Sequence, residues 1–96
     1  MAVGIIATLK IQEGKDGEFE AAFANLAAAV RANEPGNKLY QLCKSRRDAN
    51  TYVVMEIYAS EDARKAHGTS EHFRTLGAKL GPTLAGRPDI HELDVE

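Results

Sequence analysis

Two histidines, His67 and His72, lie in the stretch AHGTSEHFRTL at residues 66–76, and histidine is the side chain best suited to moving protons near neutral pH. On one continuous helix, a separation of five residues would place them about 140° apart, so they would not share a face. They also lack the i, i+4 spacing of two metal ligands on a helix. If Gly68 interrupts the helix and Ser70 caps the next one, His72 falls in a first turn, where the dipole favours the neutral imidazole that a general base requires.

A metal site is one alternative use of these side chains. His67, His72 and Glu56 offer ligand atoms, but nothing beyond residue type brings them together, and we therefore expect no metal. Cys43 is the only cysteine, which excludes an internal disulfide and a thiolate cluster within one chain. A solvated position on a polar helix is the other alternative for either histidine.

Four segments have the composition and periodicity of β-strands. Alternating apolar residues, or runs of β-branched and aromatic residues, predict strands at residues 3–11, 38–45, 51–58 and 89–95. Between the second and third segments, Asp48 and Asn50 favour a tight turn. These two strands are therefore expected to form a hairpin.

Helical spacing of apolar residues predicts two helical regions. The first lies within residues 14–33, with Asp16 as its N-cap, and it ends before Pro35. The second region consists of two helical pieces separated at Gly68. The first piece covers residues 61–67 and has Ser60 as its N-cap, and the second covers residues 71–80 and has Ser70 as its N-cap.

The resulting order, β-α-β-β-α-β, predicts an α+β fold of the ferredoxin-like class, in one domain over residues 1–96. In this fold a four-stranded antiparallel sheet carries the helices on one face. The strand at 51–58 is apolar on both sides, with Met55 on one side and Val54 on the other. Because a bare apolar face of this size is rare on a monomer, we expect a homodimer built sheet to sheet, a dimeric α+β barrel.

Charge and hydropathy argue against several classes of partner. A formal net charge of -2 gives no general attraction to nucleic acid. No apolar run approaches the length of a transmembrane helix, and the first residues lack the basic start and the cleavage site of a signal peptide. We therefore expect no nucleic-acid or membrane partner, and a cytoplasmic location.

The run YVVMEIYASEDARKAHGTSEHFRTL, residues 52–76, resembles the signature of the antibiotic biosynthesis monooxygenase domain family, dimeric ferredoxin-like proteins that include quinol monooxygenases. In that family, a strand ending in an E-x-aromatic pattern leads into a short helix and then into H-x-x-S-x-H-F. The matching positions here are Glu56, Tyr58, His67, Ser70, His72 and Phe73. The runs EGKDGEFEAAF and EPGNKLYQL are similar to the family's first helix and second strand.

The resemblance implies oxygenation of a phenol, hydroquinone or polycyclic aromatic substrate by O2, without metal, flavin or haem. Triplet oxygen reacts slowly with closed-shell molecules, so the substrate must become an electron donor through loss of a phenolic proton. His67 is the first candidate for the base and His72 the second, while Glu56 either orients a histidine or is an ordinary strand carboxylate. The side chains expected to line the substrate pocket are Tyr58, Phe73, Tyr52, Phe23 and Leu76.

Departures from the family pattern bear on the alternatives. Tyr58 stands where the family often has tryptophan, and the stretch FRTLGAKL lacks the histidine that haem-degrading relatives use as axial ligand, which disfavours haem degradation. Another branch isomerises small phosphorylated carbohydrate-derived signals, for which Arg64, Lys65 and Arg74 could supply positive charge. A dimeric ligand-binding module without catalysis is the third possibility.

Overall fold

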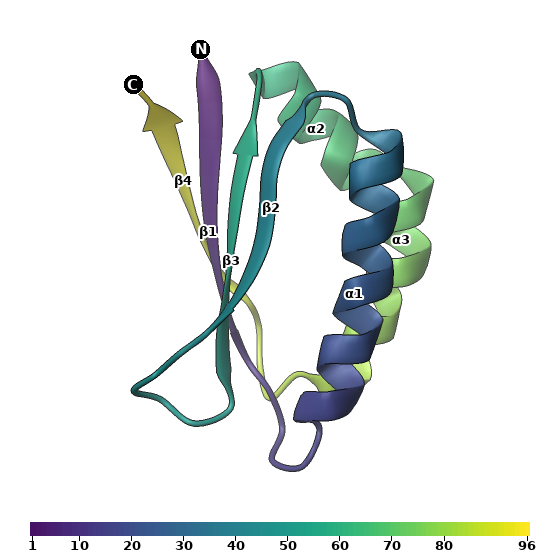
Figure 1. Ribbon diagram of the computed structural model, residues 1–96, viewed down its shortest axis with the longest axis vertical. Helices are drawn as coiled ribbons and strands as arrows, with labels where there is room; N and C mark the ends of the chain where they lie inside the picture. The colour runs from purple at the N-terminus through teal and green to yellow at the C-terminus, as the bar shows by residue number, and fades with distance from the viewer.

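The computed structural model describes residues 1–96, and its elements follow the predicted order, with the second helical region divided into three pieces (Figure 1). The strands are β1 (Ala2–Lys10), β2 (Asn37–Lys44), β3 (Thr51–Tyr58) and β4 (Asp89–Val95). The helices are α1 (Asp16–Asn33), α2 (Glu61–Thr69), α3 (Glu71–Gly77) and the 3-10 helix η1 (Ala78–Thr83). None of the helices combines the length and the apolar character that crossing a bilayer requires.

The four strands form one antiparallel sheet in the order β2-β3-β1-β4. The helices lie on one face of this sheet, and α1 runs beside α3 (Figure 1). This arrangement confirms the predicted ferredoxin-like α+β fold. Because β1 and β3 occupy the centre of the sheet, their inward side chains form the floor beneath the helices.

The hydrophobic core lies between the sheet and α1. Alternate residues of β1 and β3 point toward the helices, and the apolar face of α1 packs on them. The buried apolar residues are Val3, Ile5, Ala7, Leu9, Ile11, Phe19, Phe23, Leu26, Ala27, Val30, Tyr40, Tyr52, Val54 and Tyr58. Each large apolar side chain that is fully buried contributes about 1.5–3 kcal/mol, so this face decides where α1 lies on the sheet.

The opposite face of the sheet has no covering element (Figure 1). Its apolar side chains include Leu39, Met55 and Leu93, which are 36%, 41% and 52% exposed. In the strand register, Met55 lies opposite Ile6 of β1 and Gln41 of β2. The structure thus confirms that β3 is apolar on both of its sides.

The start of α1 differs from the prediction. Lys15, and not Asp16, occupies the N-cap position, and no side chain caps the helix there. The carboxylate of Asp16 is engaged elsewhere, since its Oδ2 accepts a hydrogen bond from Tyr52 Oη at 3.2 Å and lies 3.6 Å from Lys44 Nζ. As the first helical residue, Asp16 still favours the helix through its dipole.

The second helical region breaks at Ser70, whereas the sequence predicted the interruption at Gly68. α2 continues through Gly68 to Thr69, and Ser70 then adopts an extended conformation with φ -69° and ψ 151°. The Ser70 hydroxyl donates to the His67 carbonyl at 2.8 Å and accepts from the Phe73 N–H at 3.2 Å, so one side chain ends α2 and begins α3. Gly68 costs the helix only about 1 kcal/mol relative to alanine, which is too little to end it.

Gly36 holds the start of β2 close to α2, and alanine at this position should destabilise the fold. A Cβ at Gly36 would lie 2.7 Å from the Ala63 Cβ, closer than two carbon atoms pack. We expect Gly36→Ala to lower the free energy of unfolding by about 1–3 kcal/mol, measured by urea denaturation. Gly17→Ala is the matched control, because no atom lies within 4 Å of a Cβ placed at position 17. Alanine there should stabilise α1 by about 0.5–1 kcal/mol. Equal stability of Gly36→Ala and wild type would contradict the expected clash.

Candidate active site

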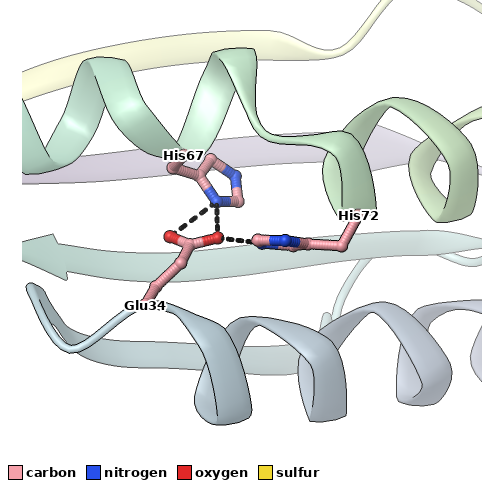
Figure 2. Close-up of side chains that lie close together, drawn as sticks. All are labelled: Glu34, His67 and His72. Atoms are coloured by element: carbon pink, nitrogen blue, oxygen red, sulfur yellow. Dashed lines mark hydrogen bonds and ion pairs between the residues drawn. The ribbon is translucent and has the colours of Figure 1, made fainter.

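Glu34, His67 and His72 converge from the ends of three helices (Figure 2). Glu34 is the C-cap of α1, His67 lies in the last turn of α2, and His72 lies in the first turn of α3. His67 Nδ1 is 2.9 Å from Glu34 Oε2 and 3.1 Å from Oε1, and His72 Nε2 contacts the same Oε2. The side chains of Glu34, His67 and His72 are 9%, 5% and 17% exposed, so these contacts are largely shielded from water.

The break at Ser70 brings the two histidines together. On one helix they would point about 140° apart, as their spacing predicts. The extended residue at Ser70 turns the chain between them, and both imidazoles reach Glu34 from adjacent helices (Figure 2). Ser70 Oγ also lies 3.2 Å from His72 Nε2, which helps to hold that ring in place.

The contact with Glu34 selects one tautomer of His67. A carboxylate only accepts hydrogen bonds, so His67 donates to it and carries its proton on Nδ1, which leaves the lone pair on Nε2. Figure 2 shows Nε2 of His67 on the side of the ring away from Glu34. A general base whose ring is oriented by a second residue has this arrangement.

An apolar cavity of about 280 Å³ opens between the helices and the sheet, and His67 lines it. Most of the other lining residues are aliphatic or aromatic, among them Phe23 of α1 and Phe73 of α3. Two further side chains bring charge to the lining, Glu56 of β3 and Arg64 of α2. The cavity lies at the small end of the range for ligand pockets, which suits a small flat ligand.

The residues expected to line the substrate pocket divide into two groups. Phe23 and Phe73 line the cavity, whereas Tyr52, Tyr58 and Leu76 do not. Tyr52 donates its hydroxyl to acidic side chains near the start of α1. Tyr58 is fully buried, with its ring centroid 5.4 Å from that of the His67 imidazole, and Leu76 packs against the core.

Glu56 makes no hydrogen bond to either histidine. Its Oε1 accepts a hydrogen bond from Tyr58 Oη at 2.6 Å, and the carboxylate that meets both imidazoles is that of Glu34. Burial raises the pKa of Glu56, although the hydrogen bond from Tyr58 partly opposes this shift. Burial and the Glu56 hydrogen bond likewise raise the pKa of Tyr58, so its hydroxyl remains a donor.

The positive charges considered for an anion site are not brought together. Arg64 lines the cavity, whereas Lys65 is exposed and lies outside it. Arg74 is exposed as well and pairs with Glu71 along α3, 3.4 Å from Arg74 Nη2 to Glu71 Oε1. Of the side chains of Arg64, Lys65 and Arg74, only that of Arg64 therefore lines the cavity where a ligand would bind.

The set of possible metal ligands differs from the one considered from the sequence. Glu34 takes the place of Glu56, and with His67 and His72 it forms a group whose ligand atoms lie within 4.8 Å of one another. Ligand atoms around tetrahedral zinc stand about 3.3 Å apart, given bonds of about 2.0–2.1 Å. His67 Nδ1 and Glu34 Oε2 are 2.9 Å apart, the length of a hydrogen bond. The donor set is one that zinc accepts, and the distances between His67 and Glu34 are those of hydrogen bonds.

Glu34 is the site residue that the sequence analysis did not single out. It ends α1, where the negative end of the helix dipole disfavours a carboxylate. An acidic residue at such a position, directly before Pro35, is the signal that the sequence contains. This signal does not identify which residues offset the unfavourable position of the carboxylate, because the two imidazoles follow more than thirty residues later in the chain.

Comparison with known proteins gives one family. The model of the antibiotic biosynthesis monooxygenase family matches residues 2–79. The Bacillus subtilis (strain 168) protein named "Putative monooxygenase YcnE" is 34% identical over 84 residues, which cover 88% of this chain and 87% of that protein.

Two crystal structures extend this similarity to the fold. A protein from Caulobacter crescentus CB15 with the same family description is 49% identical and has a TM-score of 0.96, covering 99% of this chain and 90% of its own. SnoaB, a cofactor-independent oxygenase from Streptomyces nogalater, has a TM-score of 0.83 at 21% identity, covering 98% of this chain and 92% of its own. At that identity, the likeness to SnoaB concerns the fold alone.

The raised pKa of Glu56 makes the stability of the wild type fall with increasing pH relative to Glu56→Gln. Below the ordinary carboxyl pKa of 4.5, Glu56 is protonated in both the folded and the unfolded state, and the two proteins should differ least. As the pH rises through the folded-state pKa, the buried carboxyl must ionise, and its contribution to stability is lost, whereas glutamine does not titrate and can still accept from Tyr58. Urea denaturation from pH 4 to pH 8 measures this difference. Parallel curves for the two proteins would show that burial does not perturb Glu56.

Proposed function

The chain belongs to the antibiotic biosynthesis monooxygenase family, and on this premise we propose that it is a cofactor-independent monooxygenase that oxidises a phenolic, hydroquinone or polycyclic aromatic substrate with O2. The observation that carries the proposal is the position of His67, at the wall of an apolar cavity and held through Nδ1 by a buried carboxylate. The name of the Bacillus subtilis relative, "Putative monooxygenase YcnE", supports this class of reaction.

In the proposed reaction, His67 Nε2 takes a proton from the aromatic hydroxyl, and Glu34 stabilises the imidazolium that forms. The aromatic anion then passes one electron to O2, and the resulting radical and superoxide couple at a ring carbon that carries hydrogen. The peroxide anion takes the proton back from the His67 imidazolium, and the hydroperoxide then loses water to leave a carbonyl, so one oxygen atom enters the product and the other leaves as water. The substrate supplies all the electrons that this sequence requires.

His67 is preferred to His72 as the base because only His67 lines the cavity. We assign His72 a positioning role, since its Nε2 contacts the same oxygen of Glu34 that His67 meets. With a donor on either side, the buried carboxylate has one defined orientation. The ring of His67 is further confined by Phe73, whose ring centroid lies 4.7 Å away.

The cavity supports an aromatic substrate more than a phosphorylated sugar. Phe23 and Phe73 offer flat apolar surfaces on which an aromatic ring can pack, and the lining is otherwise mostly aliphatic. A phosphate would require several donors, but Arg64 is the only cationic side chain in the lining. The isomerase alternative therefore has less support from this site.

We also propose that two copies pair through the open faces of their sheets. Met55, Leu39 and Leu93 are exposed there, around the centre and both edges of the sheet. Several exposed apolar side chains on one face favour association with another protein surface. A symmetric pair of chains would cover the open sheet face of each chain at once. The cavity lies on the helical side of the sheet and stays clear of this contact.

Replacement of His67 should strongly lower the rate of oxygen uptake. Purified wild type given a panel of hydroquinones and anthrols is expected to consume O2 with at least one of them, and chelator should not change the rate. His67→Ala should lower the rate about 10²-fold or more through loss of the base, and Glu34→Gln about tenfold or more through loss of imidazole orientation. An oxygen electrode measures the rates.

His91→Ala is the matched control, because His91 is exposed, lies outside the cavity lining, and its side chain makes its one hydrogen bond with Asp89 on β4. It should retain the wild-type rate. Uptake that persists in His67→Ala would exclude His67 as the base. Binding of aromatic compounds without any uptake would instead favour the ligand-binding module.

A charge in the centre of the open face should separate the dimer. Met55→Lys places an ammonium group among apolar residues of β3 and its neighbours, and burying it in the interface would leave it unpaired. Light scattering after gel filtration should give twice the chain mass for wild type and the chain mass for Met55→Lys. Glu71→Lys, at an exposed position of α3, is the control and should remain a dimer. A monomeric wild type would contradict the proposed pairing.

A further inference from the structure

Arg64 has a buried nitrogen without a partner. Among the buried side-chain nitrogen and oxygen atoms, Nε of Arg64 is the one that makes no hydrogen bond. Leaving a buried donor unpaired is costly, more so for a charged group, and such atoms are rare in folded proteins. Arg64 also lines the cavity, so the guanidinium that carries this unpaired nitrogen belongs to the cavity wall.

The rest of the guanidinium is only weakly engaged. Nη2 lies 3.7 Å from Glu92 Oε1, and the Glu92 side chain is 56% exposed, so this ion pair is weakened by solvent. Nη1 lies beside Gly68, where a Cβ would come within 3.3 Å of it. The absence of a side chain at Gly68 thus leaves room for the guanidinium along the wall of the cavity.

Arg64 and His67 are three residues apart on α2, which places them on the same face of the helix. Both line the cavity, so one ligand can meet the imidazole and the guanidinium together. We propose that Arg64 binds a negatively charged oxygen of the ligand, and that the site therefore selects aromatic compounds with an acidic group next to the hydroxyl. The inference rests on the proposed function, which assigns an aromatic ring and a hydroxyl to the substrate. It adds to that substrate an acidic group that Arg64 binds.

Glu56 is the charge that could oppose an anion in this cavity. Its carboxyl is buried and accepts the hydrogen bond of Tyr58, and burial raises its pKa, which reduces the repulsion. Glu34 lies behind His67 and is occupied by two imidazole donors. Arg64 is then the charge that an acidic ligand meets first.

The matched probes are 3-hydroxy-2-naphthoate and 2-naphthol, which differ by one carboxylate. Calorimetric titration of wild type should show that the naphthoate binds about tenfold or more tightly than the naphthol. Arg64→Gln should weaken naphthoate binding about tenfold or more and change naphthol binding less than about threefold. Arg64→Lys, which keeps the charge without the planar fork, should fall between wild type and Arg64→Gln.

Arg74→Gln is the control, because it removes the same charge from an exposed position on α3 and should leave both affinities unchanged. Equal affinities of wild type for the two probes, or no detectable binding of the naphthoate, would overturn the proposal. An equal loss of both probes in Arg64→Gln would also overturn it, since that result indicates a structural role. The titrations need no turnover, so the proposed oxygenation can fail while this inference stands.

Discussion

The helical layer of this protein is tied together by one carboxylate. Glu34 ends α1 and meets His67 of α2 and His72 of α3, so a single side chain joins the ends of three helices, in addition to the packing of α1 against α3. Its position at the negative end of the α1 dipole is unfavourable for an isolated carboxylate, and the two imidazole donors offset that cost. The arrangement of the helices and the orientation of the proposed base therefore depend on the same contacts.

This dependence explains why the cavity and its polar wall occur together. α2 and α3 both cover the sheet, and the turn at Ser70 that separates them also directs both imidazoles to Glu34. Glu56, which lines the cavity, forms a separate buried pair with Tyr58, which lies outside the lining. Burial raises the pKa of both groups, which disfavours their charged forms beside an apolar space.

The fold could be predicted from the sequence because its signals are local. The period-two strands, the apolar stripe of α1 and the caps at Ser60 and Ser70 each depend on residues close in the chain, and their order leaves few topologies. The predicted N-cap at Asp16 was wrong because Tyr52 and Lys44, from other elements, compete for its carboxylate. Local patterns carry no information about such distant partners.

The site was predictable only in part, for the same reason. His67 and His72 could be identified from their residue type and from the resemblance, and a break between them was predicted, but their common partner Glu34 could not be identified because it lies on a distant helix end. Glu56 matched the family signature and lies on β3, the predicted strand, yet its carboxyl oxygen accepts a hydrogen bond from Tyr58 and not from a histidine. Contacts between residues more than thirty positions apart appear only once the helices are packed.

α3 has seven residues, none of them buried, although Phe73 reaches the cavity from it. A helix this short holds its place mainly through what it packs against, and segments with few buried groups open at the least cost in free energy. Opening of this short helix would give a ligand a path between solvent and cavity. Each such opening would separate His72 from Glu34, so entry and release of the ligand would be coupled to the loosening of the carboxylate that orients the base.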